Sequence, residues 1–281
     1  MASYFITGAT GTIGKEVVTS LLENNATVIA ATRNPEKSQD LFNNKATSVH
    51  FDYGNKDTFN QVQGTDGILI IGPPLNPALF ELLEPFVGYI QDNYTGRVVY
   101  LSGYGMDALK QMPFHALMEN KLKSTNLNWN IVRPGFFMQN FGNYERENIE
   151  QRNVLFSPAG EGKTPFVSAT DIASAISVLL TDQNRKHQTH ILTGAKAYSH
   201  FDVAELLTTI LGTPIAYANP DQHTYRKVLK DSGAPDFIAD YMIPIYGLVK
   251  NGTIQNTTNS IKELTGRDPE TLEEVLKRDF S

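Results

Sequence analysis

The chain contains no cysteine among its 281 residues. This absence excludes disulfide bonds, thiol nucleophiles, iron–sulfur clusters and zinc sites with cysteine ligands. His187 and His190 lie close together in sequence, but no third ligand type stands near them, so we expect no bound metal. A chain without cysteine also fits a cytoplasmic protein, which is the location that we expect.

Long apolar runs and basic runs are absent too. No segment approaches the ~18 consecutive apolar residues of a membrane span. The N-terminus shows no basic start followed by a long apolar segment, so we expect no signal peptide. The net charge of −6 offers no bulk attraction to nucleic acid or to anionic membranes. We therefore expect a small-molecule partner, no nucleic acid, no membrane, and a monomer or homodimer.

Two motifs of other enzyme classes are missing as well. Gly162-Lys163-Thr164 resembles the end of a phosphate loop, but Ser157 stands where that loop needs a glycine, and Pro165 follows directly. The Gly-x-Ser-x-Gly turn of α/β-hydrolases does not occur. The sequence therefore favours neither a P-loop nucleotidase nor a serine hydrolase.

What is present is an alternation of short apolar segments with amphipathic ones. Strands are predicted at 4–7, 27–31, 48–51, 67–71, 97–101 and 130–132, and helices at 12–23, from Pro35, and at 57–62, 77–93 and 114–125. This alternation predicts an α/β fold with a Rossmann-type doubly wound parallel sheet. Ligands of such sheets bind beyond the carboxyl ends of the strands.

A glycine-rich turn, Gly8-Ala9-Thr10-Gly11-Thr12-Ile13-Gly14, follows the first predicted strand and opens the first helix. Glycines let the backbone approach phosphates closely, and a helix N-terminus offers free N–H groups. The spacing differs from Gly-x-Gly-x-x-Gly, so the position between strand and helix carries the prediction of a dinucleotide pyrophosphate site. The alternative is an ordinary strand-to-helix turn. The residues expected to contact the cofactor here are Gly8, Thr10, Gly11, Thr12, Ile13 and Gly14.

The end of the second strand indicates which dinucleotide binds. NAD enzymes usually carry an acidic residue there, to bind the ribose 2′-hydroxyl. This chain has Ala30-Ala31-Thr32-Arg33-Asn34 instead, and Arg33 offers a planar set of donors that suits a 2′-phosphate. With Asn34 and Lys37 beside it, Arg33 predicts NADP(H), unless it is a solvated loop arginine.

Further cofactor contacts are expected where the later strands end. The residues after the third strand are placed near the adenine, those after the fourth near the ribose, and those after the fifth and sixth near the nicotinamide. In chain order they are Asp52, Tyr53, Gly72, Pro73, Pro74, Ser102, Gly103, Pro134, Gly135 and Phe136.

The pattern changes after Pro134. Helices are predicted at 136–150, 171–180 and 201–211, a strand at 187–192, and mainly helices after that. We predict an NADP-binding Rossmann domain at 1–135 and a smaller, mainly helical substrate lobe at 136–281 that is partly interleaved with the sheet.

Five motifs together resemble the NmrA-like branch of the atypical short-chain dehydrogenase/reductases. They are the glycine turn, Thr32-Arg33-Asn34-Pro35, Leu101-Ser102-Gly103, His115-x-x-x-Glu119 and Ile131-Val132-Arg133-Pro134-Gly135-Phe136-Phe137. The similarity is to flavin-free NADPH:quinone oxidoreductases and triphenylmethane reductases, and it extends to Val167-Ser168-Ala169-Thr170-Asp171-Ile172-Ala173. It implies NADPH as cofactor, with no flavin and no metal. Some members of this branch are reductases, whereas others only sense the dinucleotide.

The helix after the fifth strand departs from ordinary short-chain dehydrogenases. Those enzymes use a Tyr-x-x-x-Lys pair there, but this chain has His115 and Glu119 at that spacing. The single Tyr-x-x-x-Lys match, Tyr246 to Lys250, lies far down the chain and is interpreted as chance. Simple alcohol–ketone chemistry is therefore not expected. An acceptor that delocalises charge needs less acid catalysis, because proximity and orientation are worth roughly 7–11 kcal/mol.

Two residues are predicted to act near the reacting atoms. His115 would protonate the reduced acceptor, or contact the ribose, or simply pack in its helix. Ser102 would form a wall or a hydrogen-bond donor beside the nicotinamide, or be a plain loop serine. An apolar aromatic pocket for the acceptor is predicted from Tyr104, Met106, Phe137, Met138 and Phe141, with core packing as the alternative.

The sequence thus predicts an NADPH-dependent oxidoreductase that transfers hydride directly to a quinone-like or other electron-poor aromatic acceptor. Two alternatives stay open. One is a non-catalytic NADP(H)-sensing regulator, and the other is a reductase of an imine or activated alkene in secondary metabolism.

Overall fold

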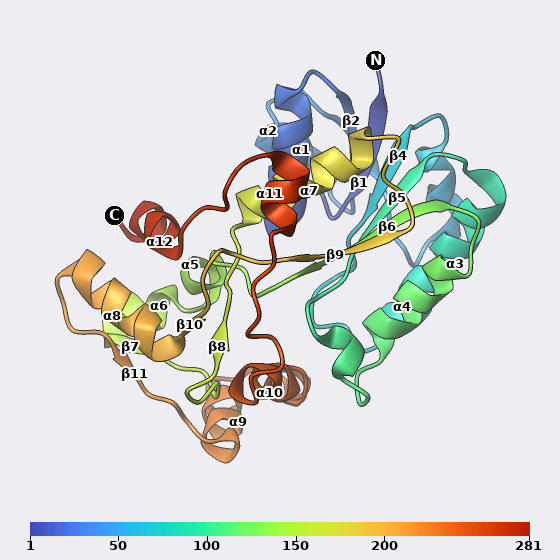
Figure 1. Cartoon of the computed structure of the whole chain (residues 1–281). Coiled ribbons are helices and arrows are strands. Elements are labelled where there is room, and N and C mark those ends of the chain that lie inside the picture. The colour runs from blue at the N-terminus through green and yellow to red at the C-terminus, as the bar shows by residue number, and fades with distance from the viewer.

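The computed structural model describes all 281 residues and contains a sheet of seven strands in the order β3-β2-β1-β4-β5-β6-β9 (Figure 1). All neighbouring strands are parallel. The order reverses between β1 and β4, so the predicted Rossmann-type doubly wound sheet is confirmed. The strands are β1 Ser3–Thr7, β2 Thr27–Thr32, β3 Thr47–His50, β4 Gly67–Ile70, β5 Arg97–Leu101, β6 Asn128–Pro134 and β9 Gln188–Leu192.

The central strands are apolar on both faces because helices cover both. In β1, Phe5 packs into one hydrophobic cluster while Tyr4 and Ile6 pack into another on the opposite face, as the period of two in a strand requires. This two-sided burial explains why the strands read as continuous apolar runs.

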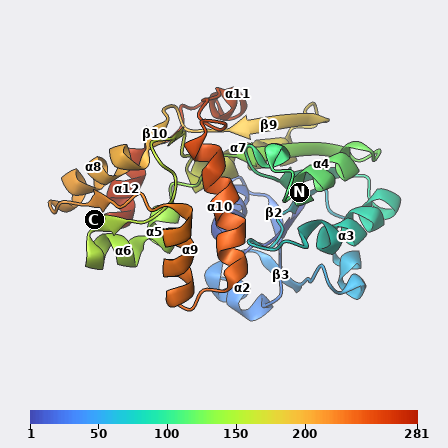
Figure 2. The ribbon, with the colours of Figure 1, turned by 90° about the horizontal axis from the view of Figure 1, so that it is seen from below.

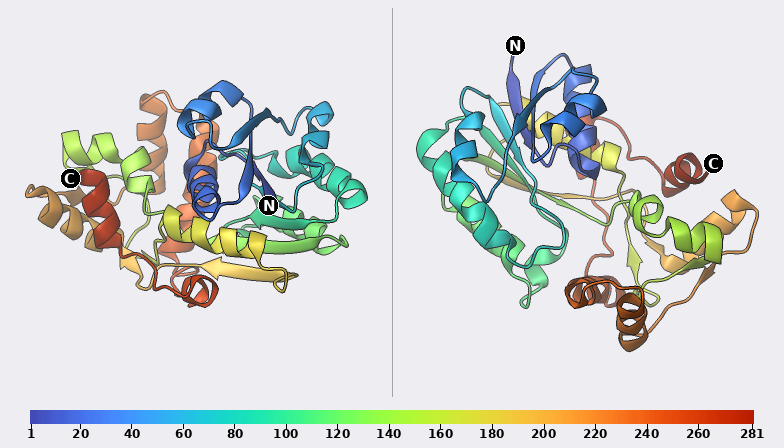
Figure 3. Two further views of the ribbon diagram at one scale, coloured as in Figure 1. Left: turned by 90° about the horizontal axis from the view of Figure 1, so that it is seen from above. Right: turned by 180° about the vertical axis from the view of Figure 1, so that it is seen from behind.

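Helices form one layer on each face of the sheet (Figure 3). Each layer contributes a separate hydrophobic cluster. One face carries the 3₁₀ helix η1 Lys56–Val62, α3 Leu79–Asn93 and α4 Phe114–Lys123, and the other carries α1 Thr12–Glu23, α2 Pro35–Leu41, α7 Ala169–Thr181 and α11 Ser260–Thr265. A short 3₁₀ turn, η2 Met106–Ala108, follows β5.

A smaller lobe lies beside the sheet and contains the C-terminus (Figure 1). Its own hydrophobic cluster joins residues from Met138 to Phe280. It consists of α5 Asn140–Tyr144, α6 Arg146–Arg152, β7 Val154–Leu155, β8 Lys163–Thr164, β10 Tyr198–Ser199, α8 His200–Leu211, β11 Ala216–Tyr217 and α12 Leu272–Phe280. Two further helices, α9 Gln222–Asp231 and α10 Asp236–Lys250, lie side by side, with α10 between the lobe and the sheet (Figure 2).

The second half of the chain returns twice to the sheet. Helix α7 packs along α1, and β9 pairs with β6 at the sheet's edge. Later, α11 packs against α7 before α12 ends the chain in the lobe. The division at residue 135 remains a prediction about domains, because the two halves share the sheet and its helical layers.

One predicted element is wrong over its first turn. Residues 136–150 were expected to be helical, but Phe137 forms a β-bridge with Val167, and helix begins only at Asn140. The side chains of Phe136, Phe137 and Met138 pack into different hydrophobic clusters, which an extended segment allows and a single helical face does not. No helix in the structure has the length and apolar content needed to cross a membrane.

Candidate functional site

The predicted cofactor segments lie along one edge of the sheet. Each follows the carboxyl end of a strand, from β1 through β6, and parallel strands bring these ends together. Pro134 is the last residue of β6, and the first turns of α1 and α2 contain Thr12, Ile13, Gly14 and Lys37. The crossover between β1 and β4 is where such sheets bind a dinucleotide.

The glycine turn forms a close backbone cradle at the start of α1. Gly8 adopts φ +59°, and the N–H of Gly11 donates to its carbonyl at 2.9 Å. A Cβ on Gly14 would lie 2.1 Å from that same carbonyl oxygen, so no larger residue fits. Gly11 offers no side-chain cap, and no group of the chain accepts from the N–H groups of Thr12, Ile13 and Gly14. These free donors at a helix N-terminus fit a pyrophosphate.

The end of β2 presents a free guanidinium. Arg33 is exposed and has no ion pair or hydrogen bond within the chain. Asn34 instead caps α2, where its Oδ1 accepts from the N–H of Lys37 at 3.1 Å. The Asn34 side chain is thus already used by the fold, while the Arg33 and Lys37 side chains remain available to an anion.

The residues after β3 form hydrogen bonds within the chain. The Tyr53 hydroxyl donates to Thr7 Oγ1 at 2.8 Å and lies 3.2 Å from the Ile71 carbonyl. Burial raises the pKa of Tyr53, so the group stays a neutral donor. Asp52 accepts from the N–H of Gly54 at 2.8 Å. Tyr53 therefore ties β1 to β4 beneath the glycine turn, and the predicted adenine contact stays a prediction.

A buried ion-pair network lies beneath the ends of β5 and β6. Ser102 Oγ donates to Glu119 Oε1 at 2.8 Å, and Arg133 binds the same carboxylate through Nε at 2.8 Å and Nη2 at 2.5 Å. Arg133 also reaches Asp107 at 2.9 Å, and Lys123 reaches Glu119 at 3.1 Å. The hydroxyl proton of Ser102 is thus committed to Glu119, which opposes the predicted donor role for Ser102 toward a ligand.

His115 forms a second buried pair. Its Nδ1 lies 2.6 Å from the hydroxyl of Tyr100, which is fully buried on β5. The hydroxyl has no other acceptor, so we assign it as donor to Nδ1, which leaves the proton of the neutral ring on Nε2. Burial lowers the pKa of His115 to about 4, although the charge of Glu119 acts in the other direction. His115 is therefore neutral near pH 7, which opposes its predicted role as a proton donor.

The five residues predicted to form an acceptor pocket are spread over three hydrophobic clusters. Tyr104 and Met106 belong to the cluster under β5, Phe137 packs on the α1 side of the sheet, and Met138 and Phe141 lie inside the lobe. Met106 fills the space beside Gly103, where a Cβ would lie 2.7 Å from its Cγ. The structure does not bring these five side chains together.

Helix α10 brings other aromatic residues to the strand ends. Tyr246 stacks on Phe136 with ring centroids 5.6 Å apart, and Tyr241 stacks on Phe114, next to His115, at 5.8 Å. The Tyr246-x-x-x-Lys250 match therefore has a place beside the site, although it lies on α10 and not on α4. Only the tertiary structure reveals the place of Tyr246, which lies over a hundred positions beyond Phe136, whereas Lys250 lies beside Gly160.

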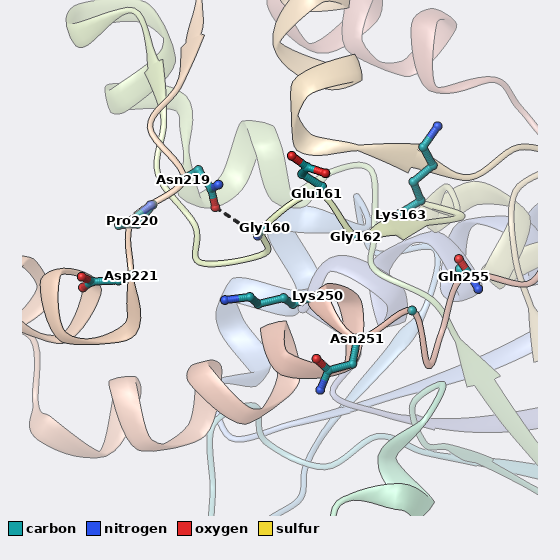
Figure 4. A pocket seen from close by; sticks show the side chains of 11 residues that line it. Gly160, Glu161, Gly162, Lys163, Asn219, Pro220, Asp221, Lys250, Asn251 and Gln255 are labelled. Atoms are coloured by element: carbon teal, nitrogen blue, oxygen red, sulfur yellow. Dashed lines mark hydrogen bonds between the residues drawn. The ribbon is translucent and has the colours of Figure 1, made fainter.

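One cavity lies away from the strand ends, and a second borders the start of α1. The larger, about 790 Å³, is bounded by the loop before β8, the turn before α9 and the end of α10 (Figure 4). Gly162 and Lys163 line it, but Lys163 and Thr164 form strand β8, so no helix begins after this phosphate-loop look-alike. The smaller cavity, about 620 Å³, lies beside α1 and includes Thr12, whose Oγ1 accepts from Asn143 at 3.3 Å.

The edge of the sheet formed by the carboxyl ends of the strands therefore carries different groups at its two ends. The β1–β2 end has free donors that fit two phosphate groups, a diphosphate and a monophosphate. The β5–β6 end has paired polar groups beside stacked aromatic rings. No group of three or more histidine and acidic side chains is arranged to hold a metal ion.

Family models match most of the chain. A model described as NAD(P)H-binding matches residues 8–183, and one described as the NmrA-like family matches residues 112–276. Together they include the glycine turn, the network around Glu119 and most of the lobe.

Three curated relatives are similar over most of their length. Prestalk A differentiation protein A of Dictyostelium discoideum is 28% identical over 99% of this chain and 93% of its own length. An NAD(P)H azoreductase of Xenophilus azovorans is 27% identical over 97% and 96%. Festuclavine synthase II of Penicillium roqueforti is 30% identical over 75% and 74%.

Two solved structures share the fold over whole chains. An NADPH-dependent quinone oxidoreductase from Escherichia coli, complexed with NADPH, has a TM-score of 0.89 with 24% identity over 99% of this chain and all of its own. A Citrobacter triphenylmethane reductase complexed with NADP(H) has a TM-score of 0.86 with 20% identity, over 99% and 100%.

Proposed function

The chain belongs to the NmrA-like family of NAD(P)H-binding oxidoreductases, as its motifs predict, and from this premise we propose that it is an NADPH-dependent reductase of electron-poor aromatic acceptors. The acceptor is a quinone or a similarly conjugated compound. The observation that carries the proposal is the pairing at the β5–β6 end: the Tyr100 hydroxyl lies 2.6 Å from His115 Nδ1, and Ser102 Oγ donates to Glu119 at 2.8 Å. Burial also lowers the pKa of His115 to about 4.

A site without an available general acid suits an acceptor whose reduction by hydride does not depend on acid catalysis. A carbonyl of an isolated ketone develops full negative charge as hydride arrives, and a general acid is typically worth ~10²–10⁴ in rate for such a step. A quinone or azo compound spreads that charge over its conjugated system. His115 contributes a hydrogen bond from Nε2 to the reduced acceptor, and solvent supplies the proton afterwards.

The free donors at the β1–β2 end support an assignment of residues to the cofactor. The N–H groups of Thr12, Ile13 and Gly14 bind the pyrophosphate, and Arg33 with Lys37 binds the 2′-phosphate, so NADPH binds more tightly than NADH. When bound, the dinucleotide supplies hydride from its nicotinamide C4. We place the planar acceptor beside Phe136 and Tyr246, whose rings stack on each other with centroids 5.6 Å apart.

The named activities of relatives support the same class of acceptor. The azoreductase is similar over nearly its whole length, and azo compounds are conjugated and electron-poor. The quinone oxidoreductase and triphenylmethane reductase structures contribute the shared fold.

The test is NADPH oxidation, followed at its absorbance band, against quinones, azo dyes and triphenylmethane dyes, with simple ketones as control acceptors. We expect turnover of the conjugated acceptors at least about 100-fold faster than that of ketones. Equal rates with ketones would contradict the acceptor class. Tight NADPH binding without turnover of any acceptor would contradict the enzyme and favour a sensor of the dinucleotide.

A second candidate is reduction of an imine or activated alkene in secondary metabolism. Festuclavine synthase II, at 30% identity, is a relative named for the product that it makes and not for a quinone or dye, which favours a biosynthetic substrate. Cyclic iminium compounds and conjugated enones belong in the same panel. Turnover restricted to these compounds would select this candidate over the first.

A further inference from the structure

The carboxylate of Glu119 lies where ordinary short-chain dehydrogenases carry a lysine, and it has an unusual number of donors. Only 2% of its side chain is exposed. Four donor atoms surround it: Ser102 Oγ, Arg133 Nε, Arg133 Nη2 and Lys123 Nζ. Glu119 therefore carries a negative charge where ordinary short-chain dehydrogenases carry a positive one, and Arg133 of β6 compensates that charge.

The ionisation state of Glu119 decides the direction of the Ser102 bond. Burial alone would raise the pKa of Glu119, but hydrogen bonds from Arg133 and Ser102 outweigh burial and lower it. A carboxylate has no proton to give, so Ser102 must be the donor. The remaining capacity of the Ser102 hydroxyl is that of an acceptor.

The backbone around Ser102 is equally fixed. Its N–H donates to the Val132 carbonyl at 2.8 Å, and the N–H of Tyr104 donates to the Pro134 carbonyl at 2.9 Å. Arg133 adds an ion pair to Asp107 in the turn η2. The loop that carries Ser102 is thus joined to β6 by two backbone hydrogen bonds and by the arginine.

We propose that Glu119 and Arg133 are positioning residues that make Ser102 an obligate hydrogen-bond acceptor for the amino group of the nicotinamide carboxamide. The inference rests on the proposed function, because it requires NADPH at this edge. Ser102 is the residue that touches the cofactor, and the ion pair acts through it.

Sheet geometry selects the carboxamide over the ribose hydroxyls. Neighbouring strands are about 4.8 Å apart, so β5 lies about 10 Å from β1, where the pyrophosphate binds. A dinucleotide whose pyrophosphate is held at β1 would bring its ribose toward β4 and its nicotinamide toward β5, the strand that Ser102 follows. Ser102 would then hold the amino group of the carboxamide.

The test compares two cofactors in the same protein. Reduced 3-acetylpyridine adenine dinucleotide phosphate keeps the carbonyl of NADPH but has a methyl group in place of the amino group. We expect wild type to bind this analogue about tenfold more weakly than NADPH, measured as dissociation constants by fluorescence titration. In Ser102→Ala the ratio of the two constants falls to about one, because the acceptor is gone.

Glu119→Gln tests the positioning role. The amide can donate to Ser102 Oγ, which frees the Ser102 proton and removes the obligate acceptor, so the ratio falls toward one here too. Because this change leaves Arg133 buried without a charged partner, Glu119→Gln/Arg133→Met provides a companion without a buried unpaired charge. A ratio measured within one variant is insensitive to the fraction that is unfolded.

Matched controls are Ser124→Ala, a serine at the end of α4, and Glu84→Gln, an exposed carboxylate paired with Lys121. Both keep the wild-type ratio. A wild-type ratio near one, or a ratio retained in Ser102→Ala, overturns the proposal. A ratio retained in both Glu119 variants but lost in Ser102→Ala overturns the role of Glu119. Wild type that binds no NADPH overturns the proposed function itself.

Discussion

The β1–β2 end and the β5–β6 end of the site differ in how many of their polar groups lack a hydrogen-bond partner within the chain. At β1 and β2 the N–H groups of the first turn of α1 are free, and Arg33 has no partner. At β5 and β6 the polar side chains of Ser102 and His115 are already bonded within the chain. One end offers donors to a ligand, and the other holds its polar groups in fixed directions.

Under the proposed function, the difference between the two ends corresponds to two tasks: the β1–β2 end binds phosphate groups, and the β5–β6 end orients the reacting rings. Binding phosphate requires donors that the fold has not used, so the cradle is made of backbone and exposed cations. Holding the nicotinamide ring against an acceptor requires side chains with fixed positions. The buried hydrogen-bonded pairs of the β5–β6 end meet that requirement. The following predictions act on one end at a time.

The largest effect is expected from Gly14→Ala in the cradle. Its Cβ would lie 2.1 Å from the Gly8 carbonyl oxygen, so the turn must shift, at a cost of about 3 kcal/mol in stability. NADPH binding is lost with the turn geometry. Urea denaturation and fluorescence titration measure the two effects. The matched control is Gly88→Ala in α3, where nothing lies within 4 Å, and which should gain ~0.5–1 kcal/mol. Equal stability and equal NADPH binding of the two variants would contradict the role of the glycine turn as the pyrophosphate site.

Acidification should weaken the fold through its buried histidines. Burial lowers the pKa of His115 and of His200 in the lobe to about 4. Below pH ~6.5 the unfolded chain binds protons that the native protein does not, so stability falls as pH drops from ~6.5 toward 4, by up to about 3 kcal/mol for each histidine.

Urea denaturation between pH 7 and 5 isolates this effect, because carboxylates titrate mainly below that range. His200→Phe should flatten the pH dependence, since one of the buried histidines is removed. Unchanged stability across this range in wild type would show that the histidines are not buried in solution.

Arg33→Ala should change cofactor preference without changing the fold. Loss of a charged hydrogen bond to the 2′-phosphate lowers the preference for NADPH over NADH by about 10- to 100-fold. The control is Arg152→Ala, an exposed arginine of the lobe that pairs with Glu147. A preference unchanged by Arg33→Ala would remove Arg33 from the cofactor site.

The smallest effect is expected at His115. As a hydrogen-bond donor that stays neutral, it should give a kcat independent of pH between 6 and 8, and His115→Ala should lower kcat less than about tenfold. A loss of 100-fold or more, with a pH dependence that His115→Ala abolishes, would instead make His115 a general acid.

The elements of the sheet were predictable because each depends on neighbours in sequence. Helix α1 and strand β5 have the bounds that their apolar spacing predicts, and Pro35 opens α2 as expected. The first turn of the predicted helix at 136–150 was not predictable, because Phe137 takes its extended form from Val167, thirty residues away.

The same distinction separates the two ends of the site. The glycine turn and Arg33 are contiguous with their strands, so the sequence locates them. The partners of Ser102 and His115 come from other strands and helices, so the sequence does not show that the Ser102 hydroxyl donates to Glu119 or that burial lowers the pKa of His115. Their roles at the site remain predictions. Tyr246 reaches Phe136 only through the path of α10, which no local pattern describes.

The return of the chain from the lobe to supply α7 and β9, and later α11, also limits how this architecture can be rebuilt. A piece ending at residue 135 would leave β6 as an open edge and uncover the face of α1 that α7 covers. No single cut separates a nucleotide-binding module from an acceptor-binding one. The lobe therefore cannot be exchanged as one contiguous piece of sequence, because α7, β9 and α11 return to the sheet from within the second half of the chain.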